Sequence, residues 1–346
     1  MTVIANDSQR STWKVSYPRG VPILNKSVSV IIPVFNGGRF IAQAVQSALE
    51  QTVVPREIIV VNDGSFDNTL EILVRFGSRI KVISIPNGGV SNARNVGINA
   101  SSCAIIAFLD ADDHWYRDKL EKQLLVMQEY PEAGFCCCNY LVRNRYDDHV
   151  VNQFDQFANE GDLIFDKPLA SGAFDLLLKF NFVGTCSSVV VRRSILEMTG
   201  LFNVDLKQSE DVELWFRCAL VTRFVVVGTS LFEKRTHDTN LTSNFLETLQ
   251  CHERVLEALS IEHGELLAKG SRLEILRSAL AKTRYEIGNE LYERGKHLAA
   301  FHYFYRGLYA WNVGVNRLQF LRHVCRKMVR LLTFGIVRNR AWRREI

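Results

Sequence analysis

The stretch Val28-Ser-Val-Ile-Ile-Pro-Val34 is an unbroken apolar run with the length of one β-strand. Three similar runs follow at 57–61, 81–85 and 104–109, and each leads into a segment with apolar residues at helical spacing. Apolar runs without polar alternation are typical of strands that helices cover on both faces. The sequence therefore predicts an α/β fold with a doubly wound, mostly parallel sheet and helices on both faces.

Polar residues stand at the carboxyl end of each predicted strand. They are Pro33–Asn36, Asn62–Ser65, Asn87–Gly89 and Asp110–Asp113. Ligands of doubly wound sheets bind beyond the carboxyl ends of the strands. We therefore expect these four segments to line one site.

The acidic segment after the fourth strand is the strongest candidate for chemistry. Asp110, Asp112 and Asp113 place three carboxylates within four residues, and these repel one another unless a cation lies among them. Carboxylate oxygens are ligands that suit Mg²⁺ or Mn²⁺. An isolated acidic turn is more often a solvated surface, but the position after a buried strand favours a metal that bridges to substrate phosphates.

Two further segments offer groups that suit a nucleotide. Asp63 can accept hydrogen bonds from a base edge or a ribose, although Asn-Asp-Gly-Ser is equally good turn chemistry. The segment Ser91-Asn-Ala-Arg94 opens a predicted helix after a glycine pair. Its amides and guanidinium suit a diphosphate or a base.

Six blocks together resemble the family 2 glycosyltransferases, which have the GT-A fold. They are Ser29–Asn36, Val60–Ser65, Asn87–Asn95, Phe108–Asp113, Ser209-Glu-Asp-Val-Glu-Leu-Trp-Phe-Arg217 and Arg235-Thr-His-Asp-Thr-Asn240. The resemblance covers roughly residues 28–243, with the blocks in the family's order and spacing. Gly88 and Ser91-Asn92 depart from the family's commoner residues, which leaves the nucleobase open.

The resemblance implies a role for each matching residue. The nucleotide-sugar would be bound by Pro33, Phe35, Asn36, Asp63, Gly89, Arg94 and Asp110. A Mg²⁺ or Mn²⁺ ion would be held mainly by Asp112, with Asp110 and His237 as further ligands. Asp211 would be the general base of an inverting transfer, with Glu210 beside it in the acidic catalytic motif. The same two acids would also favour the amino end of a helix.

Two other functional classes compete with this interpretation. An idle sugar- or nucleotide-binding module would be expected to lack the metal or base carboxylates, yet Asp110, Asp112 and Asp211 are all present. A nucleotidyltransferase usually has a glycine-rich basic loop after the first strand, which 33–40 matches poorly. Neither GxGxxG nor a Walker A sequence occurs. We expect a sugar transfer to a saccharide or lipid-linked acceptor, in polysaccharide or glycolipid synthesis.

Composition and charge favour a cytoplasmic protein that does not bind nucleic acid. Residues 317–346 carry nine Lys or Arg and one Glu, a net charge of +8, which leaves −3 for residues 1–316. The eight cysteines have no disulfide or zinc spacing. The first twenty residues lack the apolar core of a signal peptide, and no apolar run approaches the roughly 18 residues of a membrane span.

The chain beyond residue 246 has a helical composition. Ile287-Gly288, Leu291, Gly295, Ala300, Phe304 and Gly307 have the spacing of one tetratricopeptide-type hairpin, or of an ordinary helical hairpin. Before it we expect strands at 135–142 and 187–192 and helices near 174–180 and 211–220. The predicted domains are an extension (1–27), a GT-A catalytic domain (28–245), a helical hairpin region (246–316) and a basic amphipathic tail (317–346).

The tail is amphipathic between residues 318 and 332. One helical face gathers Leu321, Val324, Cys325, Met328, Leu331 and Leu332, and the other gathers Arg322, His323, Arg326, Lys327 and Arg330. Such a helix can lie in an anionic membrane interface, or it can pack on the helical hairpin with its basic side in water. We expect peripheral contact with the cytosolic face of a membrane.

Overall fold

The computed structural model describes residues 28–143, 150–157, 163–169, 172–236, 244–268 and 270–310. The chain divides into two compact units, Met1–Ser243 and Asn244–Ile346. The sequence places this boundary after residue 245, two residues further along. The extension at 1–27 and the tail at 317–346 lie outside the described residues.

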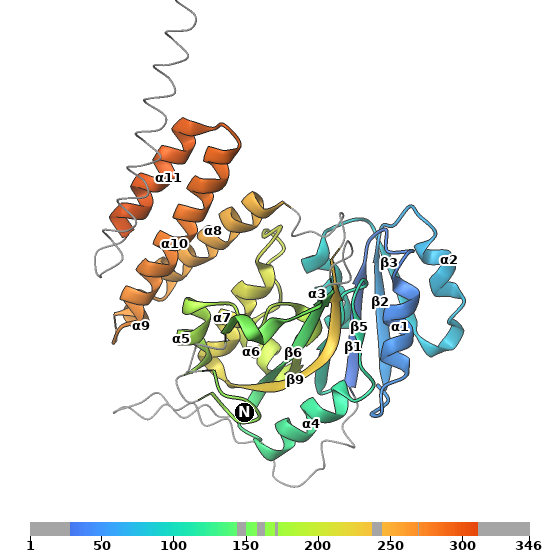
Figure 1. Cartoon of the computed structure of the whole chain (residues 1–346). Helices are drawn as coiled ribbons and strands as arrows, with labels where there is room; N and C mark the ends of the chain where they lie inside the picture. Colours follow the sequence, from blue (N-terminus) through green and yellow to red (C-terminus); the bar gives the residue numbers. More distant parts are fainter. Residues whose placement is uncertain are drawn as a thin grey trace, which may run out of the picture. The chain divides into compact units, whose positions relative to one another are not determined.

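One sheet organises the first unit. Within the described residues it has nine strands in the order β3-β2-β1-β4-β8-β6-β9-β5, with β7 paired to β6. Figure 1 labels β1, β2, β3, β5, β6 and β9 of this sheet. The strands are β1 (Val28–Val34), β2 (Glu57–Asp63), β3 (Lys81–Ile85), β4 (Ile105–Phe108), β5 (His114–Trp115), β6 (Ala133–Arg143), β7 (Val150–Asn152), β8 (Val190–Arg192) and β9 (Arg223–Arg235). The four strands β3-β2-β1-β4 are parallel, as predicted, whereas β8 runs antiparallel to both β4 and β6.

Helices connect the strands of the first unit. They are α1 (Ile41–Leu49), α2 (Thr69–Val74), α3 (Val90–Ala100), α4 (Lys119–Glu129), α5 (Ala173–Lys179), α6 (Arg193–Thr199) and α7 (Glu210–Val221). Together with the parallel strands they form the predicted doubly wound arrangement, in which the carboxyl ends of β1, β2, β3 and β4 share one edge.

The apolar strands are buried on both faces because alternate side chains pack against different helices. One core cluster joins even-numbered residues of β1 and β2 to the apolar sides of α1 and α4; it includes Val30, Ile32, Ile58, Val60, Ala44, Val45, Leu120 and Leu124. A second cluster joins Ile59 and Val61 of β2 to Ala93 of α3. The unbroken runs in the sequence follow from this two-sided burial.

Several elements differ from the expectation. The strand predicted at 187–192 begins only at Val190, because Cys186–Ser188 forms a short 3₁₀ turn. The helical segment expected after the run at 104–109 begins only at Lys119, because His114 and Trp115 form β5 and pair with β9. The long strand β9 and the helix α6 were not predicted.

The second unit is a helical bundle with its own small core. Its helices are α8 (Phe245–Glu262), α9 (Gly264–Leu267), α10 (Arg272–Glu293) and α11 (His297–Ala310). Residues from α8, α10 and α11 form the core cluster, including Leu246, Leu249, Ile287, Leu291, Ala300 and Phe304. The predicted hairpin corresponds to α10 and α11. Among the helices in the described ranges, none combines the length and hydropathy needed to cross a bilayer.

Candidate active site

The carboxyl end of β2 anchors the loop that leads into α3. Asp63, the last residue of β2, is 3% exposed and accepts the backbone N–H groups of Gly88 (2.8 Å) and Gly89 (2.9 Å). Gly89 has a φ of 86°, which glycine adopts without strain, and it directly precedes α3. No side chain caps this helix. Its first amides are therefore suited to an anionic group.

An aromatic pair stands at the carboxyl ends of β1 and β2. Phe35 is 48% exposed and meets Phe66 edge to face, with ring centroids 5.8 Å apart. Asn36 fixes this turn, since its side chain accepts the N–H of Phe66 (3.0 Å) and its own N–H donates to Ser65 (2.9 Å). Pro33 is buried inside β1. Of the three predicted residues Pro33, Phe35 and Asn36, Phe35 therefore offers an exposed ring to a planar ligand, and Phe66 beside it is 84% exposed.

One buried guanidinium joins the end of β4 to the start of α7. Arg94, 5% exposed, lies 2.9 Å from a carboxylate oxygen of Asp110 and 2.7 Å from one of Glu210. It also lies over the ring of Phe202, 5.2 Å from the centroid. Burial alone would raise the pKa of Asp110, but the Arg94 guanidinium beside it holds that pKa below its ordinary value. The fold thus brings three of the predicted site residues together.

Two hydroxyl residues that the sequence interpretation missed also hold Asp110. Its backbone N–H donates to Ser187 (2.9 Å), and Thr185 donates its hydroxyl to the carboxylate of Asp110 (2.8 Å). Both lie in the Gly-Thr-Cys-Ser-Ser stretch at 184–188. The feature of the sequence that could have identified them is this run of small hydroxyl residues next to a predicted strand. Both carboxylate oxygens of Asp110 therefore have partners within the protein.

The other two acids of the segment lie in different environments. Asp113 is 2% exposed, and burial together with the negative charges of Asp112 and Asp110 raises its pKa well above the ordinary value. Its carboxylate accepts the backbone N–H of Arg235 (3.3 Å). Asp112 is half-buried. In the part of the chain that the structure describes, no three His, Cys, Asp or Glu side chains form a ready-made metal cluster. His237 lies outside the described residues.

The acidic motif opens α7. Ser209, just before the helix, has a φ of 61°, which is uncommon for a residue with a side chain. Asp211 is half-buried and accepts the N–H of Val212 (2.7 Å). Burial, and then the charge of Glu210, raises the pKa of Asp211 to about 7. A carboxylate with this pKa can take and release a proton near neutral pH. Glu210, by contrast, is committed to its ion pair with Arg94.

Comparison with known proteins identifies the family. Residues 29–197 match the family model described as glycosyl transferase family 2. The chain is similar to an uncharacterised glycosyltransferase of Rickettsia typhi, with 30% identity over 229 residues, covering 65% of this chain and 69% of the relative. It is equally similar to a putative teichuronic acid biosynthesis glycosyltransferase, TuaG, of Bacillus subtilis, with 30% identity over 63% of this chain and 82% of that protein. The chain belongs to glycosyltransferase family 2.

Solved structures support the same fold for this glycosyltransferase. The S. aureus TarS fragment in complex with UDP-GlcNAc has a TM-score of 0.59 at 18% identity, covering 81% of each chain. The mannosyltransferase PcManGT from Pyrobaculum calidifontis, in complex with GDP-Man and Mn²⁺, has a TM-score of 0.55 at 17% identity, covering 90% of this chain and 84% of that one. The predicted GT-A fold is therefore confirmed.

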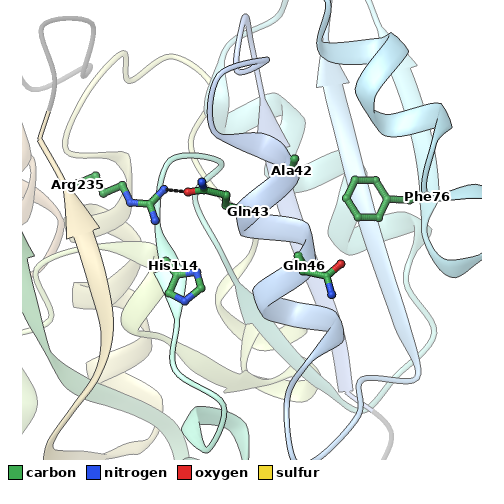
Figure 2. A pocket seen from close by; sticks show the side chains of 6 residues that line it. All are labelled: Ala42, Gln43, Gln46, Phe76, His114 and Arg235. Carbon is green, nitrogen blue, oxygen red and sulfur yellow. Dashed lines mark hydrogen bonds between the residues drawn. The ribbon is translucent and has the colours of Figure 1, made fainter.

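A pocket of the glycosyltransferase lies away from the predicted donor-binding residues. Figure 2 shows it beside α1, with a volume of about 520 Å³; its lining consists of Ala42, Gln43, Gln46, Phe76, His114 and Arg235. Two of these residues contact each other, since Arg235 donates a hydrogen bond to Gln43. None of the residues predicted to bind the donor lines this pocket.

Proposed function

We propose that this chain transfers one sugar from a nucleoside-diphosphate-sugar to an acceptor hydroxyl with inversion at the anomeric carbon. The observation that carries this proposal is the Arg94 bridge, in which one guanidinium binds both Asp110 and Glu210. Asp110 belongs to the strand edge where a donor is expected, and Glu210 adjoins the candidate base Asp211. Arg94 therefore contacts both a residue of the expected donor site and the direct neighbour of the candidate base.

Asp211 is the proposed general base. In a single displacement one base takes the acceptor proton while the acceptor oxygen attacks the anomeric carbon and the diphosphate departs. Asp211 is half-buried with a pKa of about 7, so both of its protonation states are accessible near neutral pH. No enzyme nucleophile is needed, because no covalent sugar intermediate forms. Glu210 supports the base indirectly by pairing with Arg94.

The donor is proposed to bind along the carboxyl edge of the sheet. Phe35 would stack on the base, with Pro33 and Asn36 shaping the same turn. Asp63 and Gly89 would shape the loop that meets the nucleoside, and the uncapped start of α3 would meet the diphosphate. The solved relatives with this fold hold UDP, UDP-GlcNAc or GDP-Man, which supports a nucleotide-sugar and leaves the choice of base open.

A divalent cation, Mg²⁺ or Mn²⁺, is proposed to take part. The residues present fit such an ion, because these cations are often held by one or two carboxylates together with substrate phosphates and water. Asp112 would be the main ligand; Asp110, already bound to Arg94 and Thr185, would be secondary, and His237 would complete the set. When bound, the cation would offset negative charge on the departing diphosphate. The Mn²⁺ named with PcManGT supports this assignment.

The acceptor is proposed to be a saccharide or a lipid-linked sugar in cell-surface polysaccharide or glycolipid synthesis. TuaG is named for teichuronic acid biosynthesis. The chondroitin synthase of Pasteurella multocida is 38% identical over 116 residues, which is 33% of this chain and 12% of that enzyme. We further propose that the protein is cytoplasmic and that the basic tail at 317–346 makes peripheral contact with the cytosolic face of an anionic membrane.

Donor protection against thermal unfolding tests the proposal. We expect one of UDP-, GDP- or dTDP-sugars to raise the unfolding temperature more than the nucleoside triphosphates do, and to be consumed when an acceptor is added. With Mn²⁺ present, Asp112→Ala should lose the metal-dependent part of this protection and its turnover. Asp118→Ala, which removes a carboxylate that pairs with Lys122 at the surface, should behave as the unchanged protein.

Other outcomes would point to the rival classes. Protection by a nucleoside triphosphate alone would indicate a nucleotidyltransferase. Protection by a nucleotide-sugar without turnover on any acceptor, and without donor hydrolysis, would indicate an idle binding module. Unchanged turnover of Asp112→Ala, or full activity of the unchanged protein in excess chelator, would contradict the metal assignment.

A further inference from the structure

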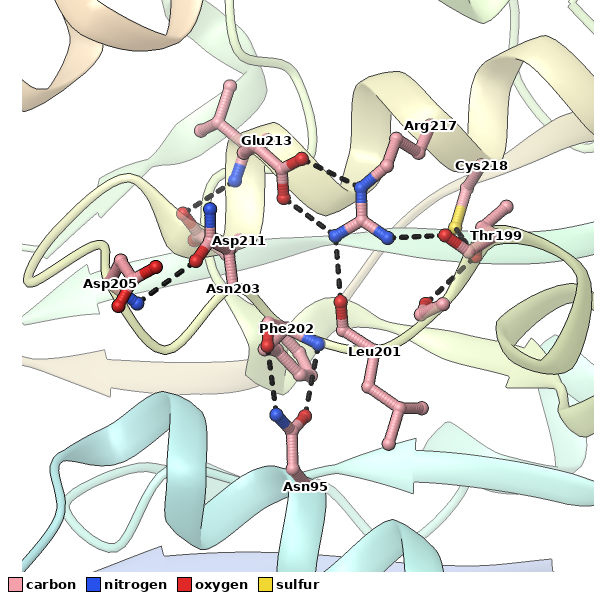
Figure 3. Close-up of polar contacts among 12 residues, drawn as sticks. Asn95, Thr199, Leu201, Phe202, Asn203, Asp205, Asp211, Glu213, Arg217 and Cys218 are labelled. Atoms are coloured by element: carbon pink, nitrogen blue, oxygen red, sulfur yellow. Dashed lines mark hydrogen bonds and ion pairs between the residues drawn. The ribbon is translucent and has the colours of Figure 1, made fainter.

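A clamp made by one arginine holds the segment that leads toward the candidate base. Arg217, on α7, forms an ion pair with Glu213 through Nε (2.7 Å) and Nη2 (2.6 Å). The same guanidinium donates to the backbone carbonyls of Thr199 (2.6 Å) and Leu201 (2.7 Å), as Figure 3 shows. Two of these hydrogen bonds lie within α7, and the other two tie α7 to Thr199 at the end of α6 and to Leu201 just after it.

A second side chain ties the same segment to α3. The amide of Asn95 donates to the carbonyl of Phe202 (2.8 Å) and accepts the N–H of Phe202 (3.0 Å). Its neighbour on α3 is Arg94, which binds Asp110 and Glu210. The segment 199–202 is therefore held from α7 on one side and from α3 on the other.

The backbone between this segment and the base is strained at one point. Ser209 has a φ of 61°, and a residue other than glycine stays in that region only where surrounding contacts fix it. Asp211 follows two residues later. Its carboxylate must meet an acceptor hydroxyl at hydrogen-bond distance, and a misplacement of about 1 Å can cost ~10²-fold in rate. The contacts that fix the start of α7 therefore bear directly on turnover.

We propose that Arg217 is a positioning residue that sets the place of Asp211 by locking the first turns of α7 to the segment 199–202. This inference rests on the proposed function, because it takes Asp211 as the base. Lysine cannot replace Arg217, since a single ammonium group cannot bind Glu213 and two carbonyls in the fixed planar geometry of a guanidinium. Arg217 is not among the residues predicted to bind the donor, so we expect its replacement to change kcat and to leave the KM for the donor unchanged.

Steady-state kinetics of Arg217→Ala and Arg217→Lys test the proposal. We expect kcat per donor-binding molecule to fall by about 10²-fold in Arg217→Ala, with the KM for the donor unchanged. Guanidinium ion, at concentrations far below those that unfold proteins, should restore part of the lost kcat of Arg217→Ala. The same addition should do nothing for Arg217→Lys, whose own side chain fills the space.

A matched control uses another arginine that pairs with a glutamate one turn away. Arg75 forms such a pair with Glu71 on α2, and both side chains are exposed. Arg75→Ala should keep the kcat of the unchanged protein, with or without guanidinium. Normalising kcat by the donor-binding fraction removes any loss that comes only from unfolded protein.

Two results would overturn the role of Arg217, and a third would instead overturn the proposed function. An unchanged kcat in folded Arg217→Ala means that the clamp does not position the base. A reduced kcat that guanidinium never restores, accompanied by a proportional rise in donor KM, means that Arg217 supports the fold as a whole. If Asp211→Asn keeps its turnover, the base assignment itself is wrong, whatever Arg217 does.

Discussion

At the scale of single residues, the three neighbouring acids that follow β4 (Asp110, Asp112 and Asp113) lie in different environments. Asp110 stays ionised because Arg94 lies 2.9 Å away and Thr185 donates to it. Asp113 is buried, and its raised pKa favours the neutral form. Asp112 remains half-buried at the strand end. The protein therefore relieves much of the repulsion with its own groups, and the proposed function takes Asp112 as the main metal ligand.

Replacing the base gives the sharpest residue-scale prediction. Asp211→Asn keeps the shape of the side chain but cannot accept a proton, so turnover should fall by at least ~10²-fold with donor affinity unchanged. In the unchanged protein only ionised Asp211 acts as base. Its kcat/KM for the acceptor should therefore rise about tenfold for each unit of pH below about 7 and level off above it. Steady-state rates measured across this range test both statements.

The stability of the same variant provides the control. Because the pKa of Asp211 is raised to about 7 from an ordinary 3.8, its stabilising contribution is complete below 3.8 and is lost as the pH rises through about 7. Asn cannot ionise. Asp211→Asn should therefore unfold at a higher temperature than the unchanged protein at alkaline pH, and at the same temperature in acid. A variant that is less stable at every pH would mean that its lost turnover reflects damage to the fold.

The sequence was informative about which residues matter at the site, but not about their partners. Asp110 and Glu210 each stood out in a short motif. Their common partner Arg94 is 16 residues from Asp110 and 116 from Glu210, so no local spacing encodes the bridge. The motifs suggested that Arg94 contacts the nucleotide, whereas the structure shows it buried in two ion pairs. Thr185 and Ser187 were missed for the same reason.

At the scale of elements, strands buried on both faces were predictable and the mixed half of the sheet was not. The runs beginning at Val28, Glu57 and Lys81 appear as β1, β2 and β3 with the predicted bounds or within two residues of them. In β9 a polar Gly-Thr-Ser at 228–230 interrupts the apolar pattern, and a register shift lies there in its pairing with β6. Because the pairing of β9 is irregular, a rule that looks for regular alternation of apolar and polar residues does not detect this strand.

The α10–α11 hairpin yields an element-scale prediction. A Cβ on Gly288 would lie 2.5 Å from the ring of Phe304, which is itself buried in the core of the second unit. Gly288→Ala should therefore destabilise this unit by about 1–3 kcal/mol despite the better helix propensity of alanine. Thermal or denaturant unfolding measures the difference.

Two further variants make this test specific. Gly264→Ala in the same unit has open space around the added Cβ and should not destabilise it. Adding Phe304→Leu to Gly288→Ala should recover part of the loss, because the smaller side chain makes room. If Gly288→Ala is as stable as the unchanged protein, the close packing of α10 on α11 is wrong.

At the scale of the whole molecule, the chain combines a GT-A unit with a helical unit and an uneven charge. The net charge of +5 is the sum of +8 in residues 317–346 and −3 in residues 1–316. The helical composition predicted beyond residue 246 corresponds to α8, which begins at Phe245. The role of the tail stays a prediction, because its residues lie outside the described ranges.

Removing the tail tests its proposed membrane contact. A chain ending at residue 316 should stay folded but lose binding to anionic vesicles. Binding of the full chain should weaken as salt rises, since exposed charges are screened within about 8–10 Å at physiological ionic strength. Activity on a lipid-linked acceptor should fall far more than hydrolysis of free donor. Precipitation of the shortened chain, together with no vesicle binding by the full one, would place the tail in the helical core instead.

The stereochemistry of the product tests the proposed mechanism most directly. With Asp211 as the base and no covalent sugar intermediate, the acceptor oxygen attacks the face opposite the departing diphosphate. The coupling constant of the anomeric proton, measured by NMR on the first product formed, reports the configuration. We predict that an α-linked donor gives a β-linked product. An α-linked product from the same donor would contradict the single displacement and, with it, the role of Asp211.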